Sequence, residues 1–247
     1  MDRLTRHELK QDEFRESLDQ LEEYLKAHFK EILTVVILVV VVVGSAAGLK
    51  YYLVQQEANA NMDLAAALRT FQAYVGTVQP GSMPDTETYT TSAAKYKAAL
   101  EKFNAIVLKY RMYPRPKAVG IALYHVGICQ SLLGNSTGAI NTLQEASHGR
   151  DREIATLAQF ALAGEFLKTG KKQEAIKIYE NLADHPSLTV PRASALLAMA
   201  DGLKDSQPAR TRQLYDQVQK EFGSDPAIAT VLRQQMAELP QSSSASR

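Results

Sequence analysis

The sequence predicts an all-α protein with three helical parts. These are an N-terminal amphipathic helix, one transmembrane helix, and an α-solenoid of about four helix pairs with a capping helix. Three observations predict this class. A long run without charged residues begins at Ile32. After it, apolar residues recur at helical spacing, and no segment of useful length alternates like a strand. A helix–turn–helix pattern also recurs at one offset, which is typical of stacked repeats.

The N-terminal amphipathic helix is expected over residues 7–29. Its acidic and amide-rich face would not be drawn to anionic lipid. The apolar stripe would therefore pair with a partner helix or a second copy, or have no specific partner. Five large apolar residues at helical spacing make this stripe, namely Phe14, Leu18, Leu21, Leu25 and Phe29.

The predicted transmembrane helix covers residues 32–54. Its first 18 positions, Ile32 to Leu49, carry no charge and would span about 27 Å as a helix. Including Val54 brings this to about 34 Å, with Lys50 reaching toward the surface, and a bilayer core is about 30 Å thick. A cleaved signal peptide is disfavoured because the preceding segment is long and acidic. Gly44 and Gly48 form a GxxxG motif, which would allow close packing with a second copy or another membrane protein.

The charges suggest an orientation for this helix. The net charge of +1 hides unlike parts, because residues 1–31 carry 6 Lys/Arg and 9 Asp/Glu while residues 55–247 carry 21 and 18. Lys and Arg near the span are slightly more numerous on its N-terminal side, which favours a cytoplasmic N-terminus and an external C-terminal domain. The domain itself covers residues 55–239, and residues 240–247 form a predicted disordered tail.

Composition excludes several classes of function. One Cys in the chain excludes a disulfide framework and a Cys-rich metal site. A charge near neutral argues against nucleic-acid binding. The five His show no metal-binding spacing, so we interpret them as surface or cap residues, and Cys129 as a buried apolar side chain. We find no cofactor motif and expect no catalytic, metal or cofactor site, so the protein is not expected to be an enzyme.

After the span, the first two predicted helices cover residues 57–78 and 89–112, with a break at 79–85. Shorter helices follow from Lys117, and residues 226–238 would cap the stack. The segment Gly134–Ile140 aligns with Gly170–Ile176 at an offset of 36. Small residues at matching positions would let paired helices approach closely, namely Gly127, Ala139, Ala146, Ala163 and Ala175.

These residues resemble the tetratricopeptide repeat. A first unit fits from Leu123 to Ala146 and a second from Leu162 to Tyr179, although Leu182 stands where that family prefers Ala. A third unit at 191–223 is degenerate. The whole layout resembles a bacterial envelope family, the tetratricopeptide repeat-like ancillary subunit of the Sec translocon. That resemblance implies a single-pass inner-membrane protein with a periplasmic repeat domain.

The resemblance also implies a function and partners. The chain would be a non-enzymatic protein-binding adaptor beside translocon subunits and periplasmic chaperones, assisting exported chains. The alternative is a structural scaffold for envelope assembly or cell division that binds no client. Through its GxxxG motif the protein could also form a homo-oligomer.

Two candidate binding surfaces follow. The family's groove is lined by the first helix of each pair, and here it would be apolar, suited to a hydrophobic segment or an amphipathic helix unless residues 57–78 fill it. Carried over to this chain, the groove positions are Ile121, Tyr124, Ile128, Leu132, Leu157, Phe160, Leu167, Lys168, Leu196 and Lys204. A basic face at seven-residue spacing would meet anionic headgroups or an acidic partner, or remain solvated; it comprises Lys95, Lys102 and Lys109.

Overall fold

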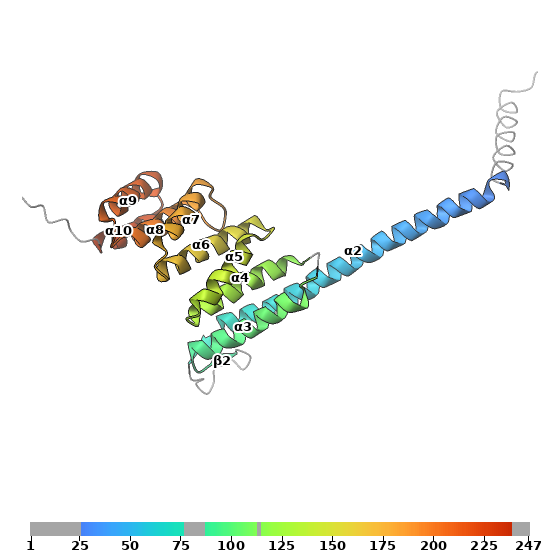
Figure 1. Cartoon of the computed structure of the whole chain (residues 1–247), viewed down its shortest axis with the longest axis horizontal. Helices are drawn as coiled ribbons and strands as arrows, with labels where there is room; N and C mark the ends of the chain where they lie inside the picture. The colour runs from blue at the N-terminus through green and yellow to red at the C-terminus, as the bar shows by residue number, and fades with distance from the viewer. Residues whose placement is uncertain (1–25, 77–86, 113–114, 239–247) are drawn as a thin grey trace, which may run out of the picture. The chain divides into compact units, whose positions relative to one another are not determined.

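The computed structural model describes residues 26–76, 87–112 and 115–238 (Figure 1). The chain divides into two compact units, Met1–Gln56 and Glu57–Arg247. Within the described residues the structure is almost entirely helical and begins with one long apolar helix, which confirms the predicted all-α class. The predicted tail and residues 7–25 of the amphipathic helix lie outside the described residues.

Helix α2 (Phe29–Gln72) is 44 residues long and includes the whole predicted span. It is long and apolar enough to cross a membrane. Its run of branched aliphatic residues is exposed, from Val35 at 60% to Val43 at 61%. The helix ends at Gln72 and not at the predicted residue 78, because Tyr74–Val75 leaves the helix as strand β1.

A two-stranded parallel ribbon follows α2, and the sequence analysis did not predict it. Strand β1 (Tyr74–Val75) pairs with β2 (Thr88–Tyr89). Tyr89, the first residue of the predicted helix 89–112, belongs to this ribbon. Helix α3 therefore begins at Ser92 and ends at Lys109, with the Thr91 hydroxyl accepting a hydrogen bond from the Ala94 N–H as its N-cap.

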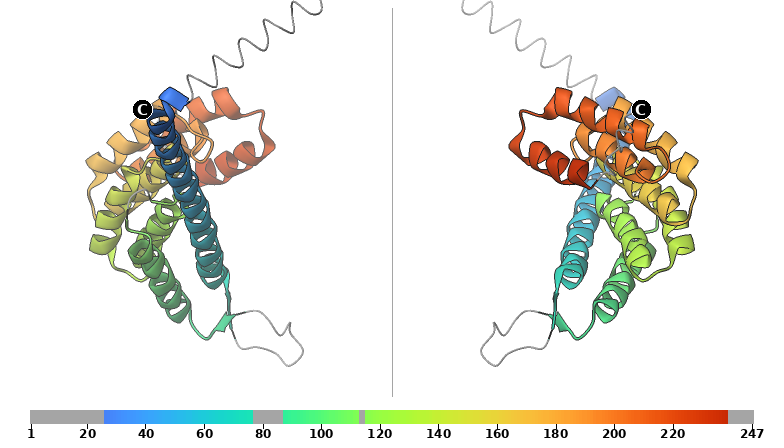
Figure 2. Two further views of the ribbon diagram at one scale, coloured as in Figure 1. Left: turned by 90° about the vertical axis from the view of Figure 1, so that its right-hand side faces the viewer. Right: turned by 90° about the vertical axis from the view of Figure 1, so that its left-hand side faces the viewer.

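Seven further helices follow α3 among the described residues, and short connections join them (Figure 2). Each packs mainly against its neighbours in the sequence, and α4 also contacts α6. The last helix matches the predicted capping helix and buries Leu232 completely. The helices are α4 (Lys117–Leu132), α5 (Ser136–Ser147), α6 (Arg152–Lys168), α7 (Lys172–Asp184), α8 (Arg192–Leu203), α9 (Pro208–Phe222) and α10 (Pro226–Ala237).

The predicted small residues lie at helix contacts, as expected. Gly127, Ala139, Ala146, Ala163 and Ala175 are all buried. A Cβ added to Gly127 would lie 2.6 Å from the Leu143 side chain, so α4 and α5 can approach this closely only because the residue is glycine.

Buried side chains form three clusters along the stack. The α2–α3–α4 cluster includes Leu64, Phe103 and Val126. The α4–α5–α6 cluster contains Leu143, Ala146, Ala158 and Leu162. The C-terminal cluster extends from Ala163 to Leu232. Every helix from the second half of α2 onward therefore contributes to a shared interior.

Candidate binding surfaces

The predicted groove residues of α4 lie along one helix but have different surroundings. Ile121 packs against the α2–α3–α4 cluster, so the chain itself covers this end of the predicted groove. Tyr124 and Ile128 pack against the α4–α5–α6 cluster. Only Leu132, at the end of α4, keeps a large exposed area, with 49% of its surface accessible.

The predicted groove residues of α6 and α8 are also largely engaged within the fold. Leu157, Phe160 and Leu167 pack against the C-terminal cluster, and the Phe160 ring lies 5.4 Å from that of Tyr179. Leu196 is only 3% exposed, so the structure assigns it to the core and not to a groove wall.

The two predicted groove lysines already have carboxylate partners. Lys204 Nζ lies 2.8 Å from Glu238 Oε2. Lys168 Nζ donates to Glu165 Oε1 over 2.6 Å and to the Ser131 hydroxyl over 2.8 Å. Burial would raise the pKa of Glu165, but the hydrogen bonds from Lys168 and Ser131 outweigh it and lower this pKa. The carboxylate therefore stays ionised and ties α4 to α6.

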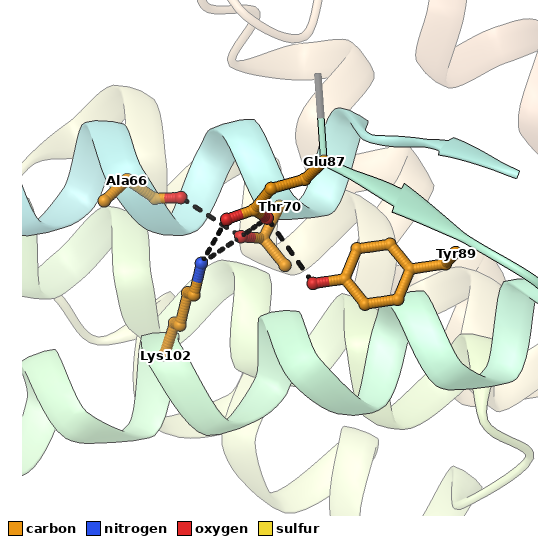
Figure 3. Close-up of polar contacts among 5 residues, drawn as sticks. All are labelled: Ala66, Thr70, Glu87, Tyr89 and Lys102. Atoms are coloured by element: carbon orange, nitrogen blue, oxygen red, sulfur yellow. Dashed lines mark hydrogen bonds and ion pairs between the residues drawn. The ribbon is translucent and has the colours of Figure 1, made fainter. Parts of the chain in front are cut away.

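The predicted basic face is also occupied by contacts within the chain. Lys102 Nζ donates to Glu87 Oε1 over 2.9 Å and to the Thr70 hydroxyl over 2.5 Å (Figure 3). Hydrogen bonds from Thr70 and then from Lys102 hold the pKa of Glu87 below its usual value. This contact joins the end of α2, the residue before β2, and α3.

The other two lysines of that face also have neighbours. Lys109 Nζ lies 2.8 Å from Asp63 Oδ2, which also accepts a hydrogen bond from the Tyr110 hydroxyl over 2.9 Å. Lys95 Nζ lies 4.8 Å from the centroid of the Tyr96 ring. Lys102 and Lys109 thus pair with carboxylates from outside α3, and Lys95 lies over a ring of its own helix. Whether this face also binds anionic groups stays a prediction.

A cleft that sequence reasoning missed lies between α5, α6 and α7. Its volume is about 370 Å³. Leu162, Phe166 and Ile178 give it an apolar lining, while amide side chains and Lys177 supply polar groups. Among the described residues that line it, none is acidic. The amides are those of Gln144, Gln159 and Asn181.

The lining explains why the sequence did not reveal this cleft. Its residues come from α5, α6 and α7, whereas the resemblance pointed to other positions, on α4, α6 and α8. Gln144, Gln159 and Asn181 have no regular spacing. Their convergence depends on how α5 and α7 pack on α6.

Among the described residues, no group of three or more His, Cys, Asp or Glu could hold a metal ion. Cys129 is buried, as predicted, and burial raises the pKa of its thiol to about 12. His148 and His185 are C-cap residues of α5 and α7, also as predicted.

The interpretation as a surface or cap residue is wrong for His125. Its ring stacks on Phe103 at 4.9 Å and meets Phe71 edge to face at 5.1 Å. Its Nδ1 is buried without a hydrogen-bond partner among the described residues. Burial lowers the pKa of His125 to about 4, so the ring is neutral near pH 7 and acts as part of the aromatic interior.

The GxxxG pair lies on the exposed part of α2. A Cβ added to Gly44 or Gly48 would meet no atom of the described chain within 4 Å. This leaves the pair open to a neighbouring helix, and its role stays a prediction.

Comparison of the whole chain with protein-family models, with curated proteins and with solved structures found no match. The functional conclusion therefore depends on the chain's own geometry and on the sequence resemblance described above.

Proposed function

We propose that this chain is a non-enzymatic, single-pass membrane-anchored adaptor whose tetratricopeptide-repeat-like helical stack binds protein segments. Its transmembrane part is the first half of α2. Its binding site is the cleft between α5, α6 and α7. The cleft is the observation that carries the proposal, because apolar side chains and three amide groups line it together.

The repeat assignment is supported by two turns that share one hydrogen-bond pattern at the offset of 36. Gly134 has a φ of 80° and Gly170 a φ of 81°, a conformation that strongly favours glycine. The N–H of Asn135 donates to the Gln130 carbonyl over 2.9 Å, and the N–H of Lys171 donates to the Phe166 carbonyl over 2.8 Å. The α4–α5 and α6–α7 connections are thus the same helix-capping turn.

The chemistry of the cleft favours an extended peptide as the ligand. Gln144, Gln159 and Asn181 present amide groups that both donate and accept hydrogen bonds, as a peptide backbone does. The apolar lining can receive one large side chain. Lys177, without an acidic residue in the lining, would favour a segment that carries a carboxylate.

The cellular context follows from the resemblance. We place the N-terminus in the cytoplasm, the span in the bacterial inner membrane and the repeat domain in the periplasm. The partners would then be exported chains, periplasmic chaperones or translocon subunits, with the cleft receiving segments that are not yet folded.

Site-specific photo-crosslinking in intact membranes tests this function. A photoreactive residue at Gln159 should capture exported chains, whereas one at Leu188, which is 91% exposed on the α7–α8 connection, should not. The same residue at Leu132 tests the groove predicted from the sequence. Mass spectrometry identifies each adduct.

The adducts distinguish the alternatives. Adducts at Gln159 that are absent at Leu132 support the cleft, and the reverse result supports the predicted groove. If both positions capture only folded envelope machinery, the protein is a scaffold and the adaptor proposal is wrong. Phe166→Ala should reduce capture at Gln159 about tenfold or more, since it removes the apolar floor, and circular dichroism checks that this variant remains folded.

A further inference from the structure

The connection between α3 and α4 lies beside the residues that directly follow the predicted span. The backbone N–H of Lys117, at the start of α4, donates to Glu57 Oε2 over 3.3 Å. Asp63, six residues further along α2, pairs with Lys109 near the end of α3. The chain thus comes back, 60 residues later, to Glu57 at the start of its helical domain.

The length of the chain keeps this connection close to the end of the span. Glu57 is three residues after Val54, where the predicted span ends. Three residues cover at most about 10 Å even when fully extended. The limit follows from connectivity alone and does not depend on the arrangement of the two units.

Large exposed apolar side chains occur at the end of α3 and on α2 next to Asp63. Leu108, in the last turn of α3, is 66% exposed, and Met112, just after the helix, is 71% exposed. Met62 of α2, next to Asp63, is also 71% exposed. Neighbouring residues of α2, α3 and α4 are buried in the interior, whereas these three large apolar side chains are exposed to solvent.

Two cations accompany these apolar groups. Arg111 and Lys117 are exposed, and no ion pair found among the described residues includes either side chain. The neighbouring carboxylates are already engaged. Asp63 pairs with Lys109, Glu145 lies 3.9 Å from Arg115, and Glu57 accepts the Lys117 N–H.

We propose that this juxtamembrane corner, formed by Leu108, Arg111, Met112 and Lys117, docks on anionic phospholipid headgroups beside the span. Cations attract an anionic leaflet, and apolar side chains enter the boundary between headgroups and acyl chains. We favour a lipid surface as the partner because Glu57, which contacts Lys117, is only three residues from the end of the predicted span. The corner therefore stays close to the headgroups. The inference rests on the proposed membrane span, and its test separates the two.

The test measures the accessibility of the corner in the full-length chain. Met112→Cys is introduced and the protein is reconstituted into nanodiscs, either of phosphatidylcholine alone or with about one third phosphatidylglycerol. The rate of labelling by a water-soluble maleimide is then measured. The native Cys129 gives little background because it is fully buried.

We expect labelling at this position to be at least about fivefold slower in the anionic nanodiscs, since each nearby cation favours the docked state about fivefold. Arg111→Glu with Lys117→Glu should restore the rate seen in phosphatidylcholine. Arg111→Lys with Lys117→Arg should preserve the protection. Lys97→Glu with Lys172→Glu changes the same charge elsewhere and should have no effect.

Leu188→Cys serves as an exposed reference that should label equally in both lipids. Equal labelling of Met112→Cys in both nanodiscs would overturn the docking proposal while leaving the span intact. Protection that appears only in native membranes would also overturn it, since a protein partner would then cover the corner. If the chain fails to enter nanodiscs of either composition, the proposed span itself is wrong. Circular dichroism of the Glu variants checks that they keep the fold.

Discussion

The two halves of α2 differ in how their apolar residues are placed around the helix. In the first half, every side of the helix is aliphatic from Val35 to Val43, and these residues are between 50% and 63% exposed. In the second half only a narrow stripe is buried, consisting of Ala60, Leu64, Ala67 and Thr70. Both halves belong to one continuous helix, so local conformation does not distinguish them.

The difference shows that apolar content and burial within the protein are separate properties. A stripe at helical spacing has a definite partner face, which α3 and α4 supply here through Phe103 and Val126. A helix that is apolar on every side has no preferred face for packing and needs apolar surroundings on all sides, as in a bilayer or a large protein core. Substitutions in the two halves should therefore affect different measurements.

The largest expected effect is on folding and comes from the second half. Leu64→Ala should lower the free energy of unfolding by about 2–5 kcal/mol, because Leu64 is 6% exposed and its removal leaves a cavity. Val40→Ala, in the first half, should leave this free energy unchanged. Denaturant unfolding of the full-length chain in detergent measures both, and equal losses would contradict the distinction between the halves.

The next effect concerns membrane insertion and comes from the first half. Val39→Lys should disfavour insertion by about 2.5–3.5 kcal/mol, since a charge at the centre of a span is costly. Ala65→Lys, at an exposed position of the second half, should not change insertion. The alkali-resistant membrane fraction gives the readout. If that fraction is undiminished in the Val39 variant, the helix does not span the bilayer.

The smallest expected effect is a pH dependence of the unfolding free energy, caused by a histidine of α4 that packs against the second half of α2. His125 packs against Phe71 of α2, and burial lowers its pKa from 6.5 to about 4. The unfolded chain then binds a proton more readily than the folded chain between these values, so stability is complete above about pH 6.5 and falls as the pH drops toward 4. The loss should be on the order of 2 kcal/mol, reduced by partial exposure of the ring.

His125→Phe should flatten this part of the profile of unfolding free energy against pH. A slope unchanged by His125→Phe would mean that other groups cause the acid sensitivity.

Much of the helical organisation could be predicted from the sequence. The long apolar helix, the last helix at Pro226–Ala237 and the burial of the small residues were predicted correctly, because each depends on spacing along one helix. The end of α2 at Gln72 and the β1–β2 ribbon were not predicted. Residues Tyr74–Val75 fit a helical pattern equally well until Thr88–Tyr89 is available as a partner.

The surroundings of the candidate surface residues could not be predicted from the sequence. The spacing of Lys95, Lys102 and Lys109 correctly placed them on one helix, but it could not show that Glu87 and Asp63 come from α2 and its ribbon to neutralise two of them. Leu196 fitted a groove position by pattern and is a core residue in the structure. Spacing along the sequence predicts which face of a helix a residue occupies, but it does not predict which residues of other segments pack against that face.

The sequence alone determined which segments are helical, which one is long and apolar enough for a membrane, and where the repeated turns at Gly134 and Gly170 fall, since these depend on local spacing and backbone conformation. Only the tertiary structure decided which faces remain open. It brought the amides of α5, α6 and α7 around one cleft and returned Lys117 to Glu57 beside the predicted span. Such surfaces arise from packing between distant segments, and no local signal in the sequence records them.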